Sequence, residues 1–172
     1  MRKIIILLMA LILNLGLITG CGGNSGSDSR DPKCADVLNY VKDKTEDGFD
    51  TVYSAGDDTY EDNYDNMYAV KRDLIDDGGI LYTEAGGLAD EITLMRIKDQ
   101  GDIQLVKDKL NDRLEQRKNQ FGGYKPEEVY KIENAVIMVS GNFVGLIISS
   151  DPPMMESIVR EAISSSTEGS EN

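Results

Sequence analysis

From residue 80 onward, the apolar residues of this chain alternate between the spacing of strands and the spacing of helices. Four runs have the strand pattern: 80–82, 92–97, 135–139 and 143–148. Three runs have the helix pattern: 101–120, 126–132 and 151–163. The order is strand, strand, helix, short helix, strand, strand, helix. It predicts an α+β fold, in which a four-stranded antiparallel sheet of two hairpins has helices packed on one face.

Small residues mark where these elements end. Ser140-Gly141-Asn142 is typical of a tight hairpin turn, and Gly122-Gly123 should end the long helix. Asp151-Pro152 should begin the last helix. We expect the charged side of the long helix to face water; it comprises Lys107, Asp108, Lys109, Asp112, Arg113, Glu115, Arg117 and Lys118.

The first 21 residues have the layout of an export signal. Arg2 and Lys3 precede an apolar stretch over 4–18, and Ile18-Thr19-Gly20-Cys21 follows. This stretch is shorter than the roughly 20 residues that a spanning helix needs. We predict a lipoprotein signal peptide over 1–20, with Cys21 lipidated and held on the extracytoplasmic face of the cell membrane. A simple membrane anchor and an ordinary cleaved signal are the alternatives.

The rest of the chain divides by composition. We expect a Gly/Ser linker over residues 21–30, an acidic helical or irregular segment over 31–78, the α+β domain over 79–165 and a disordered tail over 166–172. Within the acidic segment, Asp31-Pro32 should begin a short helix. A second short helix over 68–75 should end at Asp77-Gly78-Gly79. On the first helix, Cys34 is expected to pack as a small hydrophobe, with a reactive thiol as the alternative.

Acidic and tyrosine residues concentrate in residues 46–66, which raises the question of a calcium site. An EF-hand loop beginning at Asp57 would need Gly at its sixth position and Glu at its twelfth, but Asp62 and Tyr68 stand there. A solvated segment is therefore the favoured interpretation, and an irregular calcium site stays open. We expect no metal or other cofactor elsewhere.

Composition limits the function. The chain has no His, which removes the commonest general base and metal ligand and argues against an enzyme. Residues 1–20 hold two basic and no acidic residues, so without them the net charge falls from −13 to −15 over 152 residues. Such a charge repels nucleic acid and anionic lipid, so membrane contact is expected only through the lipid anchor.

Five short segments also occur in the order found in one family. They are Ala89-Asp90-Glu91-Ile92, Arg113-Leu114-Glu115-Gln116-Arg117-Lys118, Tyr124-Lys125-Pro126-Glu127-Glu128, Glu133-Asn134-Ala135 and Gly141-Asn142-Phe143. Over residues 80–150 the chain resembles the domain of unknown function 4358 family, small lipoproteins of Gram-positive anaerobes. Phe143 stands where Tyr is expected, which would remove any role for a hydroxyl there. The family has no established activity, so the resemblance implies location and fold and no catalytic residue.

Two places are candidates for a binding surface. Asp90 and Glu91 are adjacent in a strand and point to opposite faces, so they cannot act as one catalytic pair; holding a nearby Lys or Arg is the favoured role. Tyr124 and Lys125 lie in a loop that either contacts a partner or is a hinge with Tyr124 packed on the sheet.

The function expected from the sequence is a non-enzymatic lipoprotein that binds an envelope protein or cell-wall component. A small hydrolase using acidic residues and a solute-binding accessory protein are the alternatives.

Overall fold

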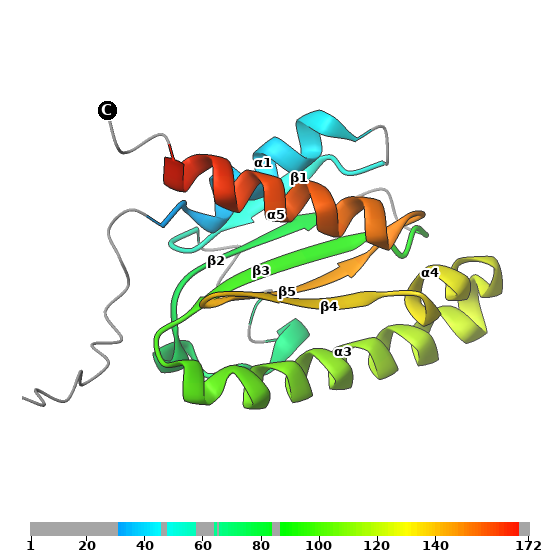
Figure 1. Ribbon diagram of the computed structural model, residues 1–172. Helices are drawn as coiled ribbons and strands as arrows, with labels where there is room; N and C mark the ends of the chain where they lie inside the picture. The colour runs from blue at the N-terminus through cyan, green and yellow to red at the C-terminus, as the bar shows by residue number, and fades with distance from the viewer. Residues whose placement is uncertain (1–30, 46–47, 58–63, 65, 84–86, 169–172) are drawn as a thin grey trace, which may run out of the picture.

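A five-stranded antiparallel sheet forms the middle layer of the molecule (Figure 1). The computed structural model describes residues 31–45, 48–57, 64, 66–83 and 87–168. The strands are β1 (Thr51–Ser54), β2 (Ile75–Tyr82), β3 (Glu91–Ile97), β4 (Val136–Ser140) and β5 (Phe143–Ile148). They lie in the order β1-β2-β3-β5-β4. The two predicted hairpins, β2 with β3 and β4 with β5, are therefore confirmed, and β3 pairs with β5 between them.

Helices cover both faces of this sheet. α1 (Cys34–Lys44) and α5 (Pro152–Glu168) lie on one face, whereas α3 (Ile103–Tyr124) and α4 (Val129–Glu133) lie on the other (Figure 1). The prediction of four strands with helices on one face was wrong in both respects. Strands buried on both faces carry near-continuous apolar runs, as β5 does with all six of its residues buried. The same runs also fit a sheet covered on one face, so the sequence pattern could not distinguish the two.

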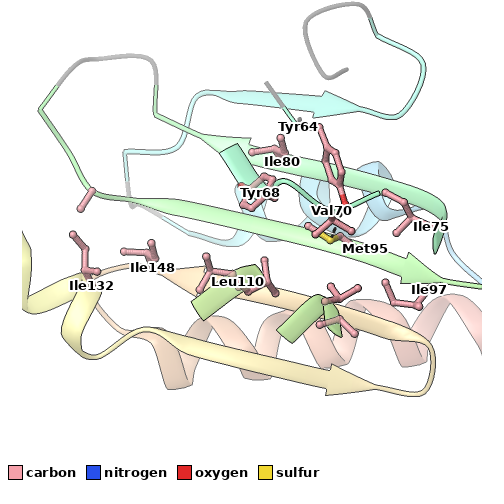
Figure 2. Packing of buried hydrophobic residues seen from close by; sticks show 14 of the residues in the cluster. Tyr64, Tyr68, Val70, Ile75, Ile80, Met95, Ile97, Leu110, Ile132 and Ile148 are labelled. Atoms are coloured by element: carbon pink, nitrogen blue, oxygen red, sulfur yellow. Dashed lines mark hydrogen bonds between the residues drawn. The ribbon is translucent and has the colours of Figure 1, made fainter. Parts of the chain in front are cut away.

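Each face of the sheet has its own hydrophobic core. Strand alternation sends Ile92 and Leu94 to the core under α1 and α5, and Met95 and Ile97 to the core under α3. Figure 2 shows the second core, in which side chains of β2, β3 and β5 meet Leu110 of α3. The segment before β2 also contributes to this core through Tyr64, Tyr68 and Val70 (Figure 2), all of which are buried.

The region before residue 80 contains strands that the sequence did not predict. The expected helix over 68–75 is instead a 3₁₀ helix over Arg72–Leu74, and β2 begins at Ile75 and continues through Gly78-Gly79. Gly79 has a packing role, because a Cβ there would lie 2.8 Å from Leu38 Cδ1 on α1. The missing side chain therefore lets α1 lie directly on β2. The acidic segment 31–78 thus shares the sheet with residues 79–165.

The start of α1 and the end of α3 differ from the sequence prediction. α1 begins at Cys34, and the side chain of its N-cap, Lys33, makes no capping bond. The Cys34 N–H donates instead to Oδ2 of Asp77 on β2 at 2.7 Å, so Asp31 does not serve as the cap. α3 continues through Gly122-Gly123 to Tyr124, and the Lys125 N–H donates to the Phe121 carbonyl at 2.7 Å. Buried Phe121 holds this last part of the helix on the core, and this packing outweighs the low helix propensity of glycine.

The C-terminal helix begins as predicted. The Met154 N–H donates to Oδ1 of Asp151 at 3.1 Å, so Asp151 caps α5. The helix continues to Glu168, past residue 166 where a disordered tail was expected. The predicted short helix after Pro126 consists of a 3₁₀ helix over Pro126–Glu128 followed by α4.

The predicted signal peptide, Cys21 and the linker 21–30 lie outside the described residues. Within the part of the chain that the structure describes, no helix is both long enough and apolar enough to cross a bilayer.

Candidate functional site

Two arginines occupy the side of α3 that faces the sheet. The buried residues of this helix are Val106, Leu110, Arg113, Arg117 and Phe121. Their spacings of four, three, four and four residues place them on one face. The prediction that Arg113 and Arg117 face water was therefore wrong, although their positions between Leu110 and Phe121 carried the signal.

Glu91 of β3 meets both arginines beneath α3. Its side chain is fully buried, and it accepts two hydrogen bonds from Arg113, from Nε to Oε1 at 3.0 Å and from Nη2 to Oε2 at 2.6 Å. The hydroxyl of Tyr68 donates to Oε1 at 2.9 Å. Nε of Arg117 lies 3.4 Å from Oε2, which is within ion-pair distance but without the geometry of a hydrogen bond. The Glu91 carboxylate is therefore the counter-charge of two guanidinium groups.

The pKa values in this cluster shift in the directions that keep Arg113 charged and Tyr68 neutral. Burial alone would lower the pKa of Arg113, but the Glu91 carboxylate, together with nearby Tyr68 and Tyr82, raises it above its ordinary value. Burial and the same carboxylate hold the pKa of Tyr68 well above its ordinary value. Tyr68 thus remains a hydrogen-bond donor to Glu91 at any physiological pH.

A pocket of about 280 Å³ opens beside this cluster. It is lined by Tyr53, Met67, Ile80, Tyr82, Arg113, Arg117 and Gln120. The β-ladder explains why the strand residues meet: Tyr53 pairs with Ile80 across β1 and β2, and Tyr82 pairs with Glu91 across β2 and β3. Ile80 and Tyr82 are two apart in β2 and share one face. The pocket therefore lies between the β1–β2 edge of the sheet and the second half of α3.

A second ion cluster lies at the start of β3. Nζ of Lys131 is 2.7 Å from Oδ2 of Asp90 and 3.0 Å from Oε2 of Glu128, and that Glu128 oxygen accepts the Ala89 N–H at 2.9 Å. Burial would lower the pKa of Lys131, yet the two carboxylates raise it above its ordinary value. For Glu128, burial alone would raise the pKa, but the Ala89 N–H and Lys131 lower it below the ordinary value.

The structure places the two candidate binding regions from the sequence in different environments. Asp90 is 2% exposed and bound to Lys131, and Glu91 is bound to Arg113, so neither forms a surface. Tyr124, at the end of α3, is 69% exposed, which excludes packing against the sheet. Lys125 lies beside Gly87, where a Cβ would be 3.1 Å from its Nζ.

Two further predictions concern Cys34 and calcium. Cys34 is fully buried in the core under α1 and α5, and burial followed by nearby Asp77 raises the pKa of its thiol well above the ordinary value. Its interpretation as a small hydrophobe is confirmed. The acidic segment 46–66 lies partly outside the described residues, at 46–47, 58–63 and 65. Among the described residues no cluster of three potential metal ligands occurs.

Comparison with known families places this geometry in context. The sequence model described as Domain of unknown function (DUF4358) matches residues 53–149, more than half of the chain. The chain belongs to this family. Every residue that lines the pocket, together with Glu91, falls within the matched DUF4358 range, whereas α1 and α5 lie outside it. No curated protein and no solved structure matches the chain.

Proposed function

We propose that this DUF4358 protein is a lipid-anchored, extracytoplasmic binding protein without catalytic activity of its own. The anchor is Cys21, and the proposed binding site is the pocket between α3 and the β1–β2 edge. The observation that carries the proposal is the kind of side chain that lines this pocket.

The polar groups at the pocket can all donate hydrogen bonds. They are the guanidinium groups of Arg113 and Arg117, the phenols of Tyr53 and Tyr82, and the amide of Gln120. Such groups orient a ligand by donating hydrogen bonds, and no carboxylate that could act as a general base lines the pocket among the described residues. Glu91 is the nearby carboxylate, and its oxygens already accept bonds from Arg113 and Tyr68. A binding role accounts for this lining better than an acid–base role.

The acidic-residue hydrolase has less support. General acid–base catalysis by two carboxylates needs a shared substrate site and distinct protonation states. Asp90 and Glu91 are each buried and each paired with a different cation, Lys131 and Arg113. Both carboxylates are therefore occupied by structural partners.

Metabolic labelling tests the anchor. In a bacterial host given radiolabelled palmitate, the full chain should incorporate the label and sediment with membranes. Cys21→Ser should lose both properties, whereas Cys34→Ala should retain both, because Cys34 is a core residue. Labelling that survives Cys21→Ser would contradict the proposed anchor.

Blocking the pocket tests the binding role. Ligand-observed NMR of the full chain against small molecules of all charge types should find binders. Gln120→Trp should abolish their binding, because Gln120 is exposed at the pocket wall and a larger ring there would fill the opening. Asn111→Trp is the matched control, since Asn111 is exposed and lies half a helical circumference away on α3. A library without binders, or binders that Gln120→Trp leaves unaffected, would reject the proposed function.

A further inference from the structure

We infer that the pocket between α3 and the β1–β2 edge binds a small organic oxyanion, a carboxylate or a phosphate on an apolar body. This inference rests on the proposed function and names its ligand class. The charge, donors and shape of the pocket each support it.

The pocket wall carries an excess of positive charge. Arg113 and Arg117 both line the pocket, and among the described residues Glu91 is the carboxylate that contacts them. Among the described residues that line the pocket, none is acidic. The chain as a whole has a net charge of −13, so this site is a local reversal of the overall charge. A guanidinium pair with one counter-charge has one positive charge left for a ligand.

Each arginine also has at least one N–H group that donates no hydrogen bond to the described residues. Hydrogen bonds to Glu91 use Nε and Nη2 of Arg113, so the two N–H groups of its Nη1 make no hydrogen bond to the described residues. Arg117 is 2% exposed, and its buried Nε has no hydrogen-bond acceptor among the described residues. An oxyanion in the pocket would supply acceptors in the planar, bidentate arrangement that guanidinium groups prefer.

The other residues that line the pocket favour a ligand whose apolar part is small. Tyr53, Tyr82, Met67 and Ile80 present aromatic rings and apolar chains opposite the arginines. A volume of about 280 Å³ lies just below the usual range of roughly 300–1,000 Å³ for ligand pockets. The site therefore suits a small aromatic or branched acid, and is too small for a nucleotide or a sugar chain.

The binding groups are held in place before a ligand arrives. The two bonds to Glu91 fix the plane of the Arg113 guanidinium, and the Ala89 carbonyl accepts a bond from Nη2 of Arg117 at 3.0 Å. Fixed donors lose little side-chain entropy on binding, and in a partly buried site their attraction for an anion is stronger than in water. The buried Glu91 is therefore a positioning residue for the two arginines.

Isothermal titration of the full chain with isosteric probes tests the ligand class. Benzoate and phenyl phosphate should bind, whereas benzyl alcohol and benzamidine, their neutral and cationic counterparts, should not. Acetate and inorganic phosphate alone should bind more weakly, because they lack the ring that contacts the apolar walls. The benzoate and phenyl phosphate titrations, compared directly, show which oxyanion the site prefers.

A substitution that adds negative charge at the pocket wall is the most direct test of anion binding. Gln120→Glu adds a carboxylate at an exposed position of the pocket wall, and it should weaken benzoate binding by about tenfold through like-charge repulsion. Asn111→Asp adds the same charge on the opposite side of α3 and should leave the affinity unchanged. Arg117→Gln retains the Glu91–Arg113 pair and should also weaken binding. Circular dichroism would confirm that each variant is folded.

The outcomes separate this inference from the proposed function. Equal binding of benzoate and benzyl alcohol, or a benzoate affinity that Gln120→Glu leaves unchanged, would overturn the oxyanion inference. The binding function would still stand if Gln120→Trp blocked the neutral ligand. Absence of any binder, with Gln120→Trp indistinguishable from the parent chain, would overturn both.

Discussion

The two faces of the sheet are built differently. Under α1 and α5 the core consists of aliphatic, aromatic and sulfur-containing side chains. Under α3 an apolar core of similar size adjoins the buried Glu91, Arg113 and Arg117. Both faces belong to one sheet, and the charged residues of the α3 face come from both layers: Glu91 from β3 and the two arginines from α3.

This contrast shows where the fold can accommodate charge. Burying ions costs several kcal/mol in desolvation, and their mutual attraction offsets this cost only when the geometry is good. Apolar packing on the α1/α5 face needs no such compensation. A buried ion cluster is thus weak evidence for stability in itself. The ion cluster lies beside the pocket, where Glu91 holds the two arginines in place. Among the described residues, the apolar face has no buried arginine to hold.

The largest predicted effect comes from breaking the ion cluster on the α3 face. Glu91→Gln keeps the size of the side chain but leaves Arg113 and Arg117 buried without a counter-charge. We expect a loss of about 3–5 kcal/mol in the free energy of unfolding, measured by urea denaturation at pH 7 with far-ultraviolet circular dichroism.

Glu115→Gln is the control for that substitution. It removes the same charge from an exposed position of α3 and should change stability by less than about 0.5 kcal/mol. If Glu91→Gln reduced the free energy of unfolding no more than Glu115→Gln does, the cluster would be energetically unimportant. The contrast between the two faces would then disappear.

A cavity on the apolar face should have a slightly smaller effect. Leu38 of α1 is fully buried and packs against Gly79. Leu38→Ala should cost about 2–5 kcal/mol, and the same urea titration measures it. Benzoate affinity should stay unchanged at a temperature where the variant is folded, because Leu38 lies on the face opposite the pocket. A coupled loss of affinity would show that the two faces do not act independently.

The local pattern of the sequence predicted most elements after residue 80. The alternation in 92–97 and 143–148 predicted β3 and β5 closely, and Gly141 between the last two strands marked their turn. It missed β1, and it missed the part of β2 before residue 80, because Gly78-Gly79 resembles a helix stop when read alone. At Gly79 the backbone of β2 lies against Leu38 of α1, a contact between residues that are distant in sequence.

The candidate site was harder to predict for a related reason. Charged residues on a helix usually face water, and this expectation placed Arg113 and Arg117 on the surface. Their burial depends on Glu91, which lies more than twenty residues away on β3. The sequence did favour a cationic partner for Glu91, but it could not identify which cation or reveal the pocket beside it.

The second ion cluster provides a smaller effect that depends on pH. Glu128 has a lowered pKa in the folded protein, so its contribution to stability is present above the ordinary glutamate value of about 4.3. That contribution is lost as the pH falls through the lowered value. Between pH 6 and pH 3, Glu128→Gln should therefore lose less stability than the parent chain, although it starts from a lower value at pH 6.

Urea titrations at a series of pH values measure this difference. Exposed Glu127 precedes Glu128, and Glu127→Gln is the matched control that should keep the pH dependence of the parent chain. Parallel curves for the parent and Glu128→Gln would show that the Ala89 N–H and Lys131 do not stabilise the ionised form.

The smallest predicted effect concerns Tyr124, the exposed residue of the surface proposed from sequence. It lies one helical turn beyond Gln120, the last residue of α3 that lines the pocket, and it is 69% exposed. Tyr124→Ala should therefore change the free energy of unfolding by less than about 0.5 kcal/mol. Benzoate affinity, measured by isothermal titration, should also stay unchanged, because the pocket wall ends at Gln120. A loss of affinity without a loss of stability would extend the binding site to the end of α3. The pocket beside Arg113 and Arg117 would then be only part of the site.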